Sequence, residues 1–175
     1  FVAADITATG GSLSSFTTDA ADYRATFTAS VQGAWSATVA AGAFTDAAGN
    51  PNIVAVLSGT ADAVAPSITS VTSLTANGNF KAGDVIDIAL TFNEGAFVTG
   101  TPTLLLETGA TDTAANYVSG SGTATLTFRY TVVAGNVSAD LNVNATAALT
   151  GTIKDAAGNT FVNAGVNALT GSNTL

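Results

Sequence analysis

Apolar and polar residues alternate with a period of two along much of this chain, and no segment shows the 3.6-residue period of an amphipathic helix. In residues 123–132 every second position is apolar, and the positions between them carry Thr or Arg. Successive side chains of a β-strand point to opposite faces, so such a segment has one core face and one solvent face. Looser alternation predicts further strands at residues 5–9, 23–29, 34–39, 53–57, 68–71, 85–92, 103–106 and 141–143. The chain is therefore predicted to be all-β.

The pentapeptide Asp-Ala-Ala-Gly-Asn occurs twice without change, at residues 46–50 and 155–159. Each copy follows a Gly-containing segment and, further upstream, an alternating strand with Tyr and Phe. This shared order predicts two homologous units, 1–62 and 63–175, with Pro66 near the start of the second because Pro cannot donate to a strand ladder. The second unit has room for about seven strands or more, and the first for about four or five.

Two further segments carry a resemblance to a known family. Residues 80–86 (Phe-Lys-Ala-Gly-Asp-Val-Ile) and 92–104 (Phe-Asn-Glu-Gly-Ala-Phe-Val-Thr-Gly-Thr-Pro-Thr-Leu) resemble the bacterial Ig-like repeats of giant surface proteins, and residues 117–123 and 155–159 continue that pattern. The first unit is similar to a sister type at residues 1–7, 11–16, 23–27 and 46–50. The resemblance implies tandem Ig-like antiparallel β-sandwiches, with the first unit lacking its N-terminal strands.

Composition excludes several classes of function. The chain has no Cys and no His, so it offers no thiolate nucleophile, no Ser-His-Asp triad and no imidazole base. With 4 Lys and Arg against 12 Asp and Glu, its net charge is −8, which disfavours nucleic-acid binding. No apolar run is long enough for membrane insertion. We expect no enzyme activity.

Charged residues make up only 9% of the chain, so Thr, Ser, Asn, Gly and Ala must cover most of the surface. A polar surface with few ions favours an extracellular or cell-surface location. Because the sequence begins at Phe1, without Met or a signal peptide, we expect it to be a processed piece or a segment of a longer protein.

The repeated pentapeptide has two interpretations. In the first, Asp and Asn side chains bond neighbouring backbone N–H groups and Gly takes a positive φ, which makes a specified turn. In the second, the motif helps to bind calcium at a junction between units, because calcium takes six to eight oxygen ligands. The candidate ligands are Asp46, Asn50, Asp62 and Glu94.

Other conspicuous residues have simpler interpretations. Asp84, Asp87 and Glu94 are not expected to form a glycosidase pair, because alternation places them on solvent faces or loops. The single Trp, Trp35, is expected in the core rather than in a sugar platform. Arg24 and Arg129 stand at outward positions of corresponding strands. Asn136 and Asn144 begin N-glycosylation sequons that we expect to stay unmodified.

A first unit without its N-terminal strands would expose a cleft lined by Ile6, Phe27, Trp35 and Val39, together with unpaired strand edges. Three outcomes stay open: upstream chain supplies the strands, the unit has shrunk to a smaller sandwich, or a second copy donates a strand. The candidate donor is the tail at residues 161–169, in which apolar and small polar residues mix.

The sequence thus favours a structural or adhesive module of an extracellular surface protein, in a tandem array or a filament that donor strands join. Its partners would be other copies or neighbouring repeats. The alternative is a module whose sandwich-end loops bind a glycan, which requires exposed aromatic side chains.

Overall fold

The computed structural model describes residues 1–19, 22–30, 32–144, 149–163, 169–170 and 173–174. The chain divides into two compact units, Phe1–Val64 and Ala65–Leu175, and the division falls two residues after the one expected from the sequence. The prediction of an all-β fold is confirmed, because the described residues form antiparallel sheets and their only helical element is the single 3₁₀ turn η1 (Ala3–Asp5). Two short pairings near the C-terminus are parallel.

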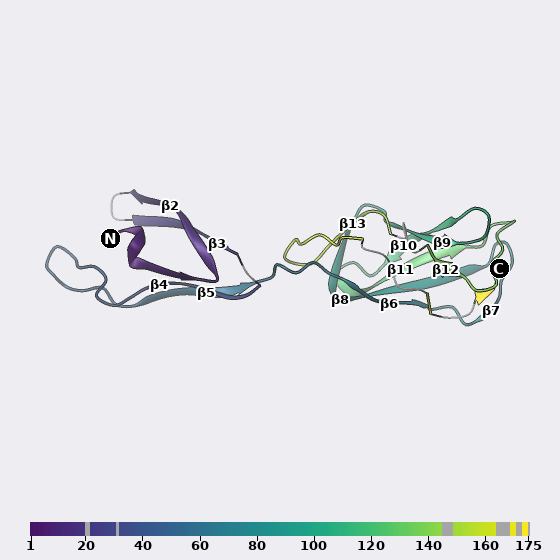
Figure 1. Cartoon of the computed structure of the whole chain (residues 1–175), viewed down its shortest axis with the longest axis horizontal. Helices are drawn as coiled ribbons and strands as arrows, with labels where there is room; N and C mark the ends of the chain where they lie inside the picture. Colours follow the sequence, from purple (N-terminus) through teal and green to yellow (C-terminus); the bar gives the residue numbers. More distant parts are fainter. Residues whose placement is uncertain (20–21, 31, 145–148, 164–168, 171–172, 175) are drawn as a thin grey trace. The chain divides into compact units, whose positions relative to one another are not determined.

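The first unit has two layers, a three-stranded antiparallel sheet and a separate hairpin (Figure 1). The sheet has the order β1-β4-β5, with β1 (Ile6–Thr9), β4 (Gly33–Val39) and β5 (Ala55–Ala61). The hairpin pairs β2 (Gly11–Asp19) with β3 (Asp22–Ala29). Between them the chain forms a layered half-sandwich in which no described residue is fully buried.

The second unit contains one large sheet in the order β12-β9-β10-β11-β8-β6-β14. Its strands are β6 (Ile68–Ser73), β8 (Val85–Thr99), β9 (Thr103–Glu107), β10 (Thr113–Ser119), β11 (Thr123–Thr131), β12 (Asn142–Val143), β13 (Thr152–Lys154), which pairs with the far end of β8, and β14 (Leu169–Thr170). The short strands β7 (Gly78–Asn79) and β15 (Asn173–Thr174) pair with each other. Buried side chains from β6 and from β8 to β13 meet in one core, so the sheet curves around it.

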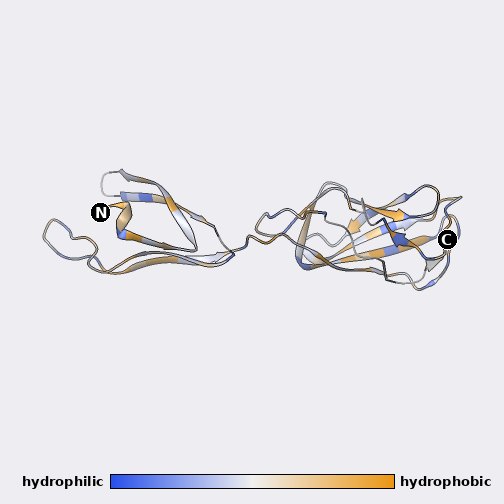
Figure 2. Cartoon of the chain, in the orientation of Figure 1, coloured by the Kyte–Doolittle hydropathy of each residue, from blue (hydrophilic) through white to orange (hydrophobic). Residues whose placement is uncertain are grey.

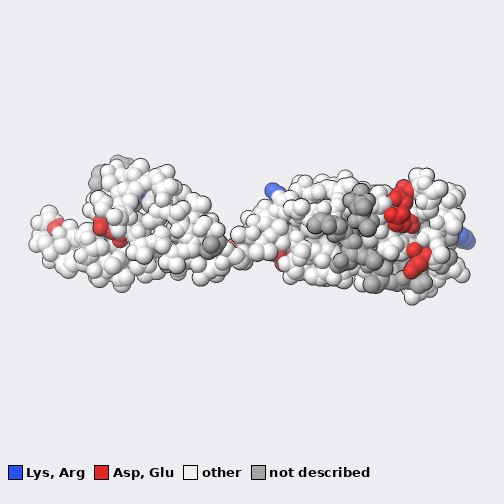
Figure 3. Space-filling model, viewed as in Figure 1, with Lys and Arg blue, Asp and Glu red and all other residues white. Residues whose placement is uncertain are grey.

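The alternation predicted for residues 123–132 is confirmed in β11, where Leu126, Phe128 and Tyr130 are fully buried. They face Leu90, Ile88 and Ile86 of β8 across the pair. Figure 2 shows the same alternation of hydrophobic and hydrophilic residues along the strands. The surface in Figure 3 is mostly uncharged, as the composition requires.

Two strands differ most from their expected bounds. The strand expected at residues 85–92 continues to Thr99. β8 bulges between Thr91 and Ala96, pairs with β11 again at Ala96 opposite Thr123, and then pairs with β13 over Phe97 to Thr99. The strand expected at residues 53–57 begins only at Ala55. Ile53 is 84% exposed and lies in the loop before the strand.

Candidate functional site

The pentapeptide of the first unit is closed by the Asp46 side chain. Its Oδ1 accepts hydrogen bonds from the backbone N–H groups of Ala48 and Asn50, both at 2.9 Å, and its Oδ2 accepts one from the Asn50 amide at 2.9 Å. The Asp46 N–H donates to the Asn50 carbonyl at 3.0 Å. Gly49 has a φ of 88°, in the left-handed region that suits glycine.

The second copy repeats this geometry. Asp155 Oδ1 accepts from the Asn159 N–H at 2.8 Å, and Oδ2 accepts from the Asn159 amide at 2.6 Å. The Asp155 N–H donates to the Asn159 carbonyl at 3.1 Å, and Gly158 has a φ of 97°. The turn interpretation of the pentapeptide is therefore confirmed in both units.

The two aspartates differ in exposure. Asp46 is exposed, and hydrogen bonds from the Asn50 side chain and backbone lower its pKa. Asp155 is only 4% exposed. Its burial raises the pKa, but hydrogen bonds from Asn159 and from two further backbone N–H groups together lower it more. Both carboxyls are therefore ionised at neutral pH.

The structure distributes the four predicted calcium ligands over both units. Asp46 and Asn50 direct their side chains into their own turn. Asp62 lies two residues before the end of the first unit and accepts a hydrogen bond from the Val64 N–H at 3.2 Å. Glu94 lies on β8, in the second unit, and accepts a hydrogen bond from the amide of its neighbour Asn93 at 3.2 Å.

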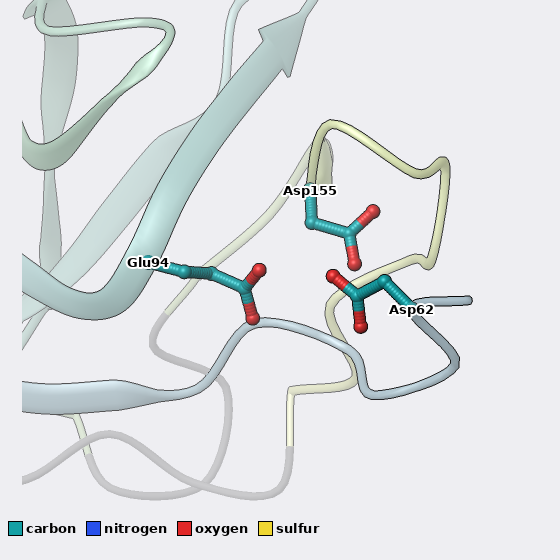
Figure 4. A group of neighbouring side chains, drawn as sticks. All are labelled: Asp62, Glu94 and Asp155. Carbon is teal, nitrogen blue, oxygen red and sulfur yellow. The ribbon is translucent and has the colours of Figure 1, made fainter. Parts of the chain in front are cut away.

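Within the second unit, Glu94 lies close to Asp155, with carboxylate oxygens no more than 4.8 Å apart (Figure 4). Asp155 is not one of the four ligands predicted from the sequence, although it begins the second copy of the repeated pentapeptide. Two carboxylates at this distance repel each other unless a cation or a proton lies between them. Figure 4 also draws Asp62 of the first unit.

Asp87 and Asp84, the other two carboxylates considered in the sequence, bond residues of their own unit. Asp87 makes a bidentate ion pair with Arg129, its partner across β8 and β11, at 2.7 and 2.8 Å. The hydrogen bond from Arg129 lowers the pKa of Asp87. Asp84 accepts a hydrogen bond from the Lys81 N–H at 2.9 Å in a tight turn. Arg24 is exposed and forms no ion pair within the described residues.

Both sequon asparagines use their amide nitrogens inside the second unit. Asn136 donates to Thr108 and Thr113 at 3.2 and 3.3 Å, and accepts from the Tyr130 hydroxyl at 2.8 Å. Asn144 donates to Asp112 at 2.9 Å, and the other two residues of its sequon lie outside the described residues. A glycan on Asn136 would replace the hydrogen that Thr108 or Thr113 accepts.

The first unit contains an apolar cavity of about 300 Å³ between its sheet and its hairpin. Its lining residues come from five strands and are all apolar: Ile6, Leu13, Ala25, Phe27, Ala37, Val39, Ala55, Val56 and Leu57. Three of the four residues predicted to line an open cleft, Ile6, Phe27 and Val39, are among them.

Trp35, the fourth residue of the predicted cleft, lies beside the cavity. Its ring stacks on Phe27 with centroids 4.7 Å apart and packs closely over Gly59, and the residue is half-buried rather than in a closed core. A second aromatic cluster places Phe1 against Tyr23 and Phe44, with both centroid distances at 4.9 Å, and against Phe16.

The tail that was the candidate donor strand makes contacts within its own unit. Phe161 packs edge-to-face on Phe92 at 5.6 Å, and its N–H donates to the Ile153 carbonyl at 2.8 Å. Leu169 pairs with Val71 where β14 joins β6. Residues 164–168 of this tail lie outside the described residues. Donation to another copy would therefore remove contacts from the second unit.

Comparison with known families identifies the first unit. Residues 1–68 match the family model of a bacterial Ig-like domain, which confirms the resemblance over this part of the chain. Neither the search of curated proteins nor that of solved structures finds a match to the chain. Within the described residues, no helix is long and apolar enough to cross a membrane.

Proposed function

We propose that this chain is a non-catalytic structural module of an extracellular surface protein, made of Ig-like units in a tandem array. The family matched by residues 1–68 indicates a structural or surface module. The observation that carries the proposal is the repeated turn: both units close the same pentapeptide with the same Asp–Asn hydrogen bonds. Repetition of one unit along a chain is how elongated arrays are built.

The surface composition supports an extracellular setting. The face drawn in Figure 3 carries few charged side chains, and charged residues make up only 9% of the chain, whose net charge is −8. The proposal includes neighbouring repeats or other copies of the chain as partners, which is the usual relation of units in an array.

The test is the location of the protein on its source cells. Antibodies raised against the 175-residue chain are expected to label intact cells, and protease added outside the cells is expected to remove the signal. Labelling that appears only after lysis would contradict the proposal. A cytosolic marker protein, followed in the same samples, controls for leakage.

We also propose that Glu94 and Asp155 of the second unit bind calcium. Their carboxylate oxygens lie no more than 4.8 Å apart, and calcium takes oxygen ligands. Of the four ligands predicted from the sequence, Glu94 belongs to this pair, whereas Asp46 and Asn50 close their own turn. Asp62 stays a predicted ligand.

Calcium that binds only the folded protein should raise its melting temperature by mass action. We expect the 175-residue chain to melt several degrees higher in excess calcium than in chelator. Glu94→Gln should remove the difference, whereas Glu107→Gln, which changes the exposed glutamate on β9, should keep it. Equal melting temperatures of the unaltered chain in calcium and in chelator would contradict the proposal.

A further inference from the structure

The two layers of the first unit meet where Phe27 stacks on Trp35, but they leave an apolar cavity between them. All the residues that line the cavity of about 300 Å³ between them are apolar. Val56 and Leu57 at its rim are 60% and 63% exposed. Small-molecule sites combine an apolar lining with a few placed polar groups, which this lining lacks. The strands that line it also carry backbone N–H and C=O groups along their edges.

One of those edges is that of β3. In the described part of the chain, β3 pairs with β2 alone. Strand edges with free N–H and C=O groups are sites at which a further strand can add. The cavity and the free edge meet at Ala25 and Phe27, which lie on β3 and line the cavity.

The second unit shows what covers the corresponding strand. β3 corresponds to β11, because each alternates, each carries an outward arginine, and each precedes the repeated pentapeptide. β11 has two neighbours, β10 and β8. β8 runs antiparallel to β11, and its alternate residues Ile86, Ile88 and Leu90 are fully buried against it.

The two arginines extend this correspondence to charge. Arg129 of β11 pairs with Asp87 of β8, directly opposite it in register. Arg24 holds the equivalent place on β3, is exposed, and has no ion-pair partner within the described residues. A strand that covers β3 in the same way would place a carboxylate opposite Arg24 and apolar side chains opposite its neighbours Tyr23 and Ala25.

We propose that the first unit binds an extended peptide strand, antiparallel to the free edge of β3, with the pattern apolar–acidic–apolar centred opposite Arg24. The apolar side chains of this strand fill the cavity, and its acidic side chain pairs with Arg24. The inference rests on the proposed array of Ig-like units, since a homologous segment of the β8 type is the occupant that such an array would supply.

The chain itself provides a probe for this site. A synthetic peptide of residues 83–93 (Gly-Asp-Val-Ile-Asp-Ile-Ala-Leu-Thr-Phe-Asn) carries the pattern and contains no Trp. Trp35, the only Trp of the chain, stacks on Phe27 beside the cavity and reports occupancy by its fluorescence. We expect the peptide to shift the Trp35 emission of the 175-residue chain to the blue, saturably, and to raise the melting temperature of the first unit.

Matched variants test which face of β3 the peptide covers and whether Arg24 pairs with its acidic side chain. Ala25→Asp puts a charge on the cavity lining, whereas Thr26→Asp puts one on the outward face of the same exposed strand. Peptide affinity should fall at least tenfold in the first variant and change little in the second. Arg24→Glu should weaken the peptide several-fold, and a peptide with Lys in place of its central Asp should bind this variant better than it binds the unaltered chain.

Two results would overturn the proposal. One is the absence of any saturable response to the peptide. The other is self-association of the chain that Ala25→Asp abolishes while the peptide has no effect, which would make a second copy the occupant. The cell-surface experiment depends on neither result. If the peptide does not bind, antibody labelling of intact cells still tests the proposed location of the protein.

Discussion

Asp155 combines two roles that a local turn does not require together. Its side chain closes the pentapeptide, as that of Asp46 does, yet it is only 4% exposed and lies within 4.8 Å of Glu94. Asp46 makes the same hydrogen bonds at an exposed position. A comparison of the two copies therefore shows how much burial, as opposed to the turn's own hydrogen bonds, changes the contribution of the aspartate to stability.

Replacement of the two aspartates by Ala should have unequal results. Asp155→Ala leaves the Asn159 N–H and amide without their acceptor at a shielded position, where a lost hydrogen bond is most costly. Asp46→Ala exposes the equivalent Asn50 groups to water. We expect a fall of several degrees in the melting temperature of the second unit for Asp155→Ala and a smaller fall in that of the first unit for Asp46→Ala. Calorimetry measures both, and equal losses would contradict the expectation.

Up to about pH 8, the stability of the fold should depend on pH only in acid solution. The folded-state pKa values of Asp46, Asp87 and Asp155 are all lowered, so these groups stabilise the fold above their unfolded pKa of about 4 and lose that effect as the pH falls through the folded values. The chain has no His to titrate near neutrality. Stability should be flat from about pH 5 to 8 and fall below about pH 4.

Thermal melts across this range check the pH prediction. Asp87→Asn removes the ion pair with Arg129, so its melting temperature should depend less on pH below about pH 4. A variant whose acid sensitivity matches that of the unaltered chain would show that the Asp87–Arg129 pair does not contribute.

At the scale of the elements, β4 and β5 approach each other around a glycine. A Cβ on Gly59 would lie 2.8 Å from the Trp35 ring, too close for a carbon contact. Gly59 thus lets the ring lie flat over β5 while stacking on Phe27. A Cβ on Gly78, in β7, would lie 4.0 Å from its nearest neighbour, the Phe80 ring, so this position has room for a side chain.

Gly59→Ala should displace the Trp35 ring and destabilise the first unit by about 1–3 kcal/mol, the usual cost of overpacking. Gly78→Ala is the matched control and should be nearly neutral. Urea denaturation followed by Trp35 fluorescence measures the change for Gly59, and circular dichroism follows the control. An unchanged Trp35 spectrum in Gly59→Ala would indicate that the ring is free to move aside.

On the scale of the whole molecule, the two units differ in how much they bury. The second unit has a core of fully buried side chains from seven strands, whereas no described residue of the first is buried. Burial of apolar surface is the main favourable contribution to folding. The free energy of unfolding should therefore be larger for the second unit than for the first.

We expect two thermal transitions, with the first unit melting at the lower temperature. Trp35 fluorescence reports that unit alone, and calorimetry reports both. Addition of the 83–93 peptide should raise only the lower transition if the strand site exists. A single transition that both probes follow together would contradict the expected independence.

The strands that could be predicted are those with large alternating side chains, because the period of two is a local property of the chain. Among the strands of seven residues or more, β2 and β10 were missed, as were the short strands β7, β13, β14 and β15. In β2 the pattern breaks where Ser15 takes a φ of 53° and the register shifts, and in β10 the buried residue is the small Ala115. The open cleft of the first unit was predicted in three of its residues, because the number of strands can be counted along the sequence.

The sequence by itself determined the all-β class, the repeated turn and the apolar faces of the strands, because each depends on residues within about ten positions of one another. Only the tertiary structure decided that Glu94 meets Asp155, that Asp87 meets Arg129 and that Asn136 bonds Tyr130 and Thr108. Most of these partners lie far apart along the chain, and strand order and register bring them together. Register depends on how all the strands pack around one core, and no single segment encodes that packing.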